Sequence, residues 1–120
     1  MSNERRIEKI DELIKREIGS LLLRDYGGDG TYLLTVTDVK TAGNIQTAKV
    51  FISIMPEAKS EKIMRFLQHR IHDIQHYLNR QLRMRPVPKI ILVADMAGAK
   101  MSKTLEAIRK LKDDPNFTEN

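Results

Sequence analysis

All three histidines of this 120-residue chain lie close together, at His69, His72 and His76. Two histidines four residues apart on a helix can chelate zinc, so a metal site has to be considered. No glutamate, aspartate or cysteine completes a convincing ligand set, and the HExxH motif is missing. The sequence therefore favours solvated histidines that help to contact phosphate or RNA bases, and it predicts no metal and no other cofactor.

The segment that holds the histidines, residues 60–89, also carries the excess positive charge. Seven basic side chains stand there against Glu61 and Asp73, which gives +7 − 2 = +5, the net charge of the whole chain. The seven are Lys62, Arg65, Arg70, Arg80, Arg83, Arg85 and Lys89. An excess confined to one segment indicates a polyanionic partner rather than solubility alone.

Catalytic chemistry finds little support elsewhere in the chain. The glycine-rich run 27–30 is followed by neither Lys-Ser nor Lys-Thr and opens no helix, so we interpret it as a connecting loop and not a phosphate loop. Asp38 and Asp95 end predicted strands, where turn or capping roles are the simpler interpretation. Cysteine is absent, which excludes disulfides and thiolate chemistry. The sequence predicts a protein that is not an enzyme.

Hydrophobic periodicity predicts the elements that would position these residues. A single α+β domain with helices over one face of a three-stranded sheet follows from the order of the elements. They are expected over residues 4–23 (helix), 32–40 and 46–54 (hairpin), 60–83 (helix), 89–94 (strand) and 102–112 (short helix). Residues 1–112 would form the domain, and 113–120 a flexible tail. No apolar run is long enough for a membrane span, and the amino terminus resembles no targeting signal, so a soluble cytoplasmic protein is expected.

The helix over 60–83 separates an apolar face from a basic face when it is drawn at 100° per residue. Ser60 is expected to cap it, and Arg70 interrupts the pattern, which favours a bend near residues 70–72. A solvated charged face is the simpler alternative, but such faces usually mix signs. The apolar face would comprise Ile63, Phe66, Leu67, Ile71, Ile74, Leu78 and Leu82, and the basic face Lys62, Arg65, His69, His72, His76, Arg80 and Arg83. The third strand is apolar on both faces, as expected for a strand buried on both sides or centrally placed.

Several motifs in order resemble the bacterial ribosome-binding factor A family over roughly residues 5–111. The most specific is Leu82-Arg83-Met84-Arg85-Pro86-Val87-Pro88-Lys89-Ile90, followed by Asp95 at the family's usual distance. Thr35-Val36-Thr37-Asp38-Val39 and Ala48-Lys49-Val50-Phe51-Ile52-Ser53 are similar to its first two strands, and Arg5-Arg6-Ile7 opens a similar first helix. Two features depart from the family. Arg70-Ile71-His72 replaces alanine-x-glycine in the long helix, and Gly28-Asp29-Gly30 replaces aspartate-proline-arginine after the first helix.

The resemblance implies a type II KH-like fold in which a kink in the long helix replaces the GxxG loop. It also implies a non-enzymatic factor that binds the small ribosomal subunit and its rRNA during late maturation and rRNA processing, often in cold adaptation. We expect a monomer whose RNA contacts come from Lys62, Arg65, His76, Arg80, Arg83, Arg85 and Lys89, extended by Arg5 and Arg6. The alternatives are a generic single-stranded RNA-binding KH-like module and a protein-interaction or homodimer module that uses an exposed sheet edge.

Overall fold

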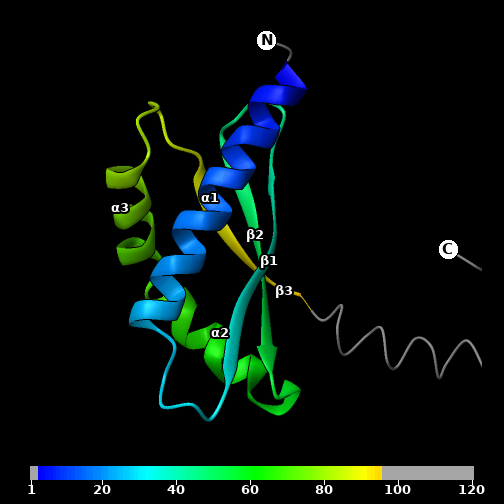
Figure 1. Cartoon of the computed structure of the whole chain (residues 1–120), viewed down its shortest axis with the longest axis vertical. Coiled ribbons are helices and arrows are strands. Elements are labelled where there is room, and N and C mark those ends of the chain that lie inside the picture. The colour runs from blue at the N-terminus through cyan, green and yellow to red at the C-terminus, as the bar shows by residue number, and fades with distance from the viewer. Residues whose placement is uncertain (1–2, 96–120) are drawn as a thin grey trace, which may run out of the picture.

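The computed structural model describes residues 3–95, and within them the elements follow the expected order α-β-β-α-β. The elements are α1 (Asn3–Asp25), β1 (Leu33–Thr41), β2 (Thr47–Met55), the 3-10 turn η1 (Glu57–Lys59), α2 (Ser60–His69), α3 (Ile71–Gln81) and β3 (Lys89–Ala94) (Figure 1). The helix expected over 102–112 and the tail expected from 113 lie outside the described residues. No helix within residues 3–95 is long and apolar enough to cross a membrane.

The three strands form one sheet in the order β1-β2-β3. β1 and β2 make the predicted antiparallel hairpin, with a register irregularity between Val36 and Asp38, whereas β2 and β3 run parallel. The predicted alternation in β2 is confirmed, because Ala48, Val50 and Ile52 are buried while Lys49 is exposed. One face of the sheet therefore belongs to the core.

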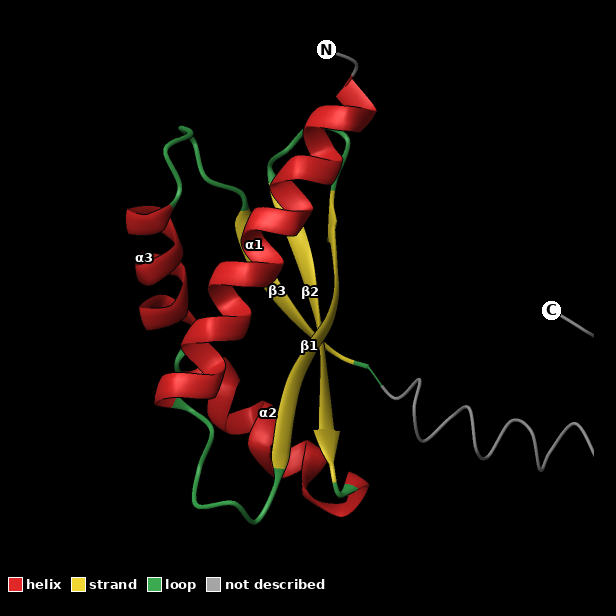
Figure 2. Ribbon diagram, viewed as in Figure 1, coloured by secondary structure: helices red, strands yellow, loops and turns green. Residues whose placement is uncertain are grey.

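The helices cover that buried face, so the molecule has two layers (Figure 2). Alternating strand residues and one stripe of each helix meet between the layers, and burial of their apolar surface stabilises the fold. The largest fully buried side chains are Ile14, Ile18, Leu22, Val50, Ile52, Leu67, Ile74, Leu78, Pro88 and Ile90. Asp11 on α1 is hydrogen-bonded to the end of β1. Its Oδ1 accepts hydrogen bonds from Thr41 N at 2.8 Å and from Thr41 Oγ1 at 2.6 Å.

The long helix is interrupted at Arg70, as the sequence predicted. Arg70 has φ −103° and ψ 10°, and its N–H bonds to Leu67 O at 2.9 Å. α2 and α3 consequently point in different directions (Figure 2). The break occurs without glycine, and it lets Leu67 on α2 and Ile74 on α3 both reach the core. The Arg70 guanidinium lies over the Phe66 ring, 5.6 Å from its centroid.

Three expectations need correction. Phe66 is 41% exposed rather than packed against the sheet, and its ring instead forms a T-shaped pair with the Tyr26 ring at a centroid distance of 6.0 Å. On α2 the core side is taken by Leu67, with Ile63 and Met64 packed against it, so Phe66 lies at the margin of the apolar face. Ser60 is the first residue of α2 and not its cap, because η1 runs directly into the helix from Lys59.

The third correction concerns β3, which is an edge strand with only one buried face. Ile90 and Leu92 point into the core, whereas Ile91 is 39% exposed. Two glutamines cover the free edge of this strand. Gln68 Nε2 donates to Leu92 O at 3.3 Å, and Gln75 Oε1 accepts from Ile90 N at 2.7 Å. A covered edge is a poor template for an added strand.

Candidate nucleic-acid interface

A basic groove lies between the amino-terminal part of α1 and the chain that leaves α3. It has a volume of about 210 Å³ and is lined by Arg6, Lys9, Ile10, Leu13, Leu82, Arg83 and Met84. Arg6 and Lys9 share one face of α1 because they are three residues apart. The fold thus brings Arg6 to Arg83, as expected from the sequence. Arg5 is exposed on α1 but does not line the groove.

The buried side chain of Leu82 sets the position of Arg83. α3 ends at Gln81, and Leu82 adopts an extended conformation with φ −88° and ψ 139° while its side chain enters the core. Arg83 is therefore directed to the surface, where it is exposed. Arg85 has a structural role here, since its Nη1 donates to Leu82 O at 2.9 Å and to Met84 O at 2.6 Å.

The outer face of α3 extends the basic surface beyond the groove. His76 and Arg80 are exposed on it, four residues apart and hence on one side of the helix. Asp73 is also exposed there, and its carboxylate lies 3.9 Å from the Arg70 guanidinium. His69 and His72 are exposed as well. Within residues 3–95, no group of three His, Cys, Asp or Glu side chains is placed to hold a metal ion.

The break at Arg70 separates Lys62 and Arg65 from the residues of α3. Lys62 lines a different hollow, together with Asp29 and Tyr32 from the loop after α1. The pKa of Asp29 is lowered mainly by a hydrogen bond from the Thr31 side chain and secondly by one from the Thr31 backbone N–H. This neighbour of Lys62 therefore stays anionic. Arg65 pairs with Glu61 at 3.0 Å on the surface. The basic face predicted for residues 60–83 is thus divided between two helices.

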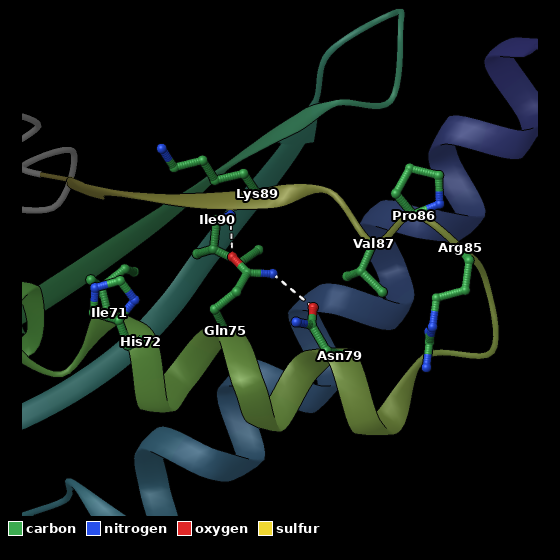
Figure 3. A pocket seen from close by; sticks show the side chains of 9 residues that line it. All are labelled: Ile71, His72, Gln75, Asn79, Arg85, Pro86, Val87, Lys89 and Ile90. Atoms are coloured by element: carbon green, nitrogen blue, oxygen red, sulfur yellow. Dashed lines mark hydrogen bonds between the residues drawn. The ribbon is translucent and has the colours of Figure 1, made fainter.

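A second groove, which we call the amide groove, lies between α3 and β3 (Figure 3). Its volume is about 430 Å³, and its lining residues are Ile71, His72, Gln75, Asn79, Arg85, Pro86, Val87, Lys89 and Ile90. Gln75 reaches across it to the β3 backbone, and its Nε2 donates to Asn79 Oδ1 at 3.0 Å and to Pro88 O at 3.1 Å. The Lys89 side chain points away from α3 (Figure 3), so it does not join the cations of the helices.

Two residues of this region were missed by the sequence analysis. Lys9 could have been found, because a helical projection of the first helix places it beside Arg6. The role of Gln75 could not have been found in this way. Its bonds to Ile90 and Pro88 join residues far apart in the chain, and no local pattern indicates them.

The sequence matches the family model described as "Ribosome-binding factor A" over residues 6–108. Among curated proteins of that name, the one from Nostoc punctiforme is 34% identical over 118 residues, which cover 95% of this chain and 84% of the relative. The one from Gloeothece citriformis is 31% identical over 117 residues, covering 94% of this chain and 88% of the relative.

Solved structures give the same fold. The crystal structure of ribosome-binding factor A from Thermus thermophilus superposes with a TM-score of 0.62 at 21% identity, over 73% of this chain and 94% of that one. A homology model of the Thermus thermophilus factor, fitted into a cryo-EM map of its 30S complex, has a TM-score of 0.58 at 24% identity, over 72% and 91% of the two chains.

Proposed function

This chain belongs to the ribosome-binding factor A family, and from that premise we propose that it binds the small ribosomal subunit. It would act there as a non-enzymatic assembly factor that assists late maturation and processing of the subunit's rRNA. The name of the curated relatives and the 30S complex described for the Thermus thermophilus factor support this assignment. We expect the factor to work as a monomer in the cytoplasm, with its largest effect on assembly in the cold.

The basic groove carries the assignment of the contact surface. Arg6, Lys9 and Arg83 come from segments more than seventy residues apart, yet they line one hollow. No ion pair of these three side chains is found within residues 3–95, so their charge is available to phosphates. Phosphate contacts release counterions and position a protein on RNA without reading its sequence. Arg80 and His76 would extend the same surface along α3.

The competing hypotheses differ in what the structure offers them. A generic single-stranded RNA-binding module would use the amide groove, which is lined by the amides of Gln75 and Asn79. A homodimer formed through the β3 edge finds less support, because Gln68 and Gln75 already bond to that edge. Ribosome specificity therefore has to be tested against free RNA.

The test is binding of the purified protein to small subunits, large subunits and free rRNA over a series of salt concentrations. We expect selective, salt-sensitive binding to small subunits. Arg83→Glu should weaken it and reduce the slope of log K against log[salt] by about one for the phosphate contact that is lost. Lys15→Glu is the matched control, since Lys15 is exposed. It lies nine residues after Arg6, which is about two and a half helical turns, and therefore on the opposite side of α1.

The outcomes separate the hypotheses. Equal affinity for small subunits and free RNA would replace this assignment with a generic RNA-binding function. If Arg83→Glu and Lys15→Glu had the same effect on affinity and salt slope, the basic groove would not be the contact surface. Combining Arg80→Glu with Arg83→Glu should lower the affinity for small subunits and the salt slope further, because the double variant lacks a second cation of the same basic surface.

A further inference from the structure

The face of the sheet that is turned away from the helices carries three lysines at one end. Lys40 on β1 lies directly opposite Lys49 on β2, and Lys49 is in turn the partner of Ile91 on β3. Lys89 begins β3, two residues before Ile91 and opposite Thr47. All three lysines are exposed, and the Lys89 side chain points away from the helical layer (Figure 3). We call this surface the lysine face.

The pairing of Lys40 with Lys49 is unfavourable for the isolated protein. Like charges directly opposite one another on antiparallel strands destabilise the pair. Within residues 3–95, neither of these lysines nor Lys89 forms an ion pair that would relieve the repulsion. Lysine often protects an edge strand against aggregation, but Lys49 is on the central strand β2, where that explanation fails. An anionic partner would account for this arrangement.

An aromatic and aliphatic surface adjoins the lysines on the same face. Phe51 follows Lys49 at the next outward position of β2 and is half-buried between its sheet partners Asp38 and Val93. Ile91 adds exposed apolar area beside Lys49. An aromatic ring with cations close by is the combination on which unpaired bases stack while their phosphates are neutralised.

Two carboxylates lie on or beside this face: Asp38 is opposite Phe51 and two residues from Lys40, and Asp95 follows the end of β3. Asp38 Oδ1 accepts a hydrogen bond from Val39 N at 2.9 Å, and Asp95 accepts one from Thr37 Oγ1. Neither carboxylate forms an ion pair with Lys40 or Lys49 within the described part of the chain. Three lysines stand against these two carboxylates, so the lysine end carries a net positive charge.

We propose that the lysine face binds a short single-stranded segment of RNA, with Lys40, Lys49 and Lys89 on phosphates and Phe51 beneath a base. This surface is separate from the basic groove, because the groove lies in the helical layer and the lysine face lies across the sheet from it. The inference goes beyond binding to the small subunit: the domain would hold two RNA segments at once, one against each layer.

The test uses the full-length protein and a fluorescently labelled oligouridine of about ten nucleotides, followed by fluorescence anisotropy. Lys49→Glu should weaken binding about tenfold and reduce the salt slope by about one. The same substitution places a carboxylate opposite Lys40, so the melting temperature should stay the same or rise. Unfolding therefore cannot explain a loss of affinity in this variant.

A second variant and two controls complete the test. Phe51→Leu keeps an apolar side chain but removes the ring, and it should weaken oligouridine binding about tenfold through lost stacking. Lys15→Glu makes the same change of charge at a position on α1 and should leave oligouridine binding unchanged. Arg83→Glu should bind oligouridine like the wild-type protein even though it loses affinity for small subunits, which separates this proposal from the proposed function.

Two results would overturn the proposal. The first is wild-type affinity for oligouridine in both Lys49→Glu and Phe51→Leu. The second is the absence of saturable oligouridine binding together with a mass that rises with protein concentration and returns to that of the monomer in Lys49→Glu. That outcome would assign the lysine face to a second copy of the chain.

Discussion

Replacing Gln75 by leucine tests whether a single side chain joins α3 to the edge of the sheet. Gln75→Leu keeps a side chain of similar size and good helix propensity. It removes the acceptor of the Ile90 N–H, at 2.7 Å, and the donor to Pro88 O, at 3.1 Å. Both partners belong to buried residues, so replacement bonds to water are hindered.

The expected loss of stability follows from the group that is left without a partner. A buried donor without an acceptor costs about 1–3 kcal/mol, and the added apolar contact of leucine in the half-buried site offsets little of it. The free energy of unfolding should therefore fall by about 1–3 kcal/mol. For a domain of this size the melting temperature should fall by roughly 4 °C per kcal/mol.

Urea denaturation followed by circular dichroism measures this change, and amide hydrogen exchange at Ile90 measures it locally. Gln81→Leu is the matched control, because Gln81 is exposed at the end of the same helix and its stability change should stay within about 0.5 kcal/mol. The reasoning would be refuted if the two variants were equally stable and the Ile90 amide kept its protection.

Two further predictions concern packing and titration. Ile74→Ala should lower the free energy of unfolding by about 2–5 kcal/mol, because Ile74 is fully buried. Phe66→Ala should lower it by under about 1 kcal/mol, because Phe66 is exposed. Similar losses for the two variants in urea denaturation would contradict the exposure of Phe66. Thr31→Ala should raise the pKa of Asp29 toward its usual value, as measured by NMR titration, because the Thr31 side chain holds that pKa down. Since the folded pKa lies below the unfolded one, the contribution of Asp29 to stability is present above the unfolded pKa and is lost as the pH falls through the folded one. An unchanged titration in Thr31→Ala would assign the shift to the backbone.

Elements with a strong local pattern were predicted well from the sequence. β1 and β2 lie within one residue of their expected bounds, because outward Lys49 alternates with inward Ala48 and Val50. The interruption of the long helix was also predicted, since Arg70 falls within an apolar stripe. The exposure of Phe66 was not predicted, because its ring contacts Tyr26 and Arg70 instead of the sheet, and these contacts depend on the tertiary fold.

Features that depend on strand order were beyond the sequence. An apolar strand such as β3 can be central or, as here, at the edge with one face open, and composition alone does not decide between them. The grouping of cations was predicted in part: Arg6 and Arg83 line one groove, but the side chain of Lys89 points away from α3. The cross-strand partner of Lys49 follows only from the register of the hairpin.

The break at Arg70 also divides the helical layer into parts that can open separately. A continuous helix would transmit the stability of one half to the other, whereas α3 is held by its own buried Ile74 and Leu78 and by the bonds of Gln75 to β3. Local unfolding of α3 would expose its buried Ile74 and Leu78, but it would not require α2 to unfold with it. A partner that binds across the basic groove requires the closed form, so its binding free energy adds to the stability of α3. Binding of such a partner would then be coupled to the order of one short helix.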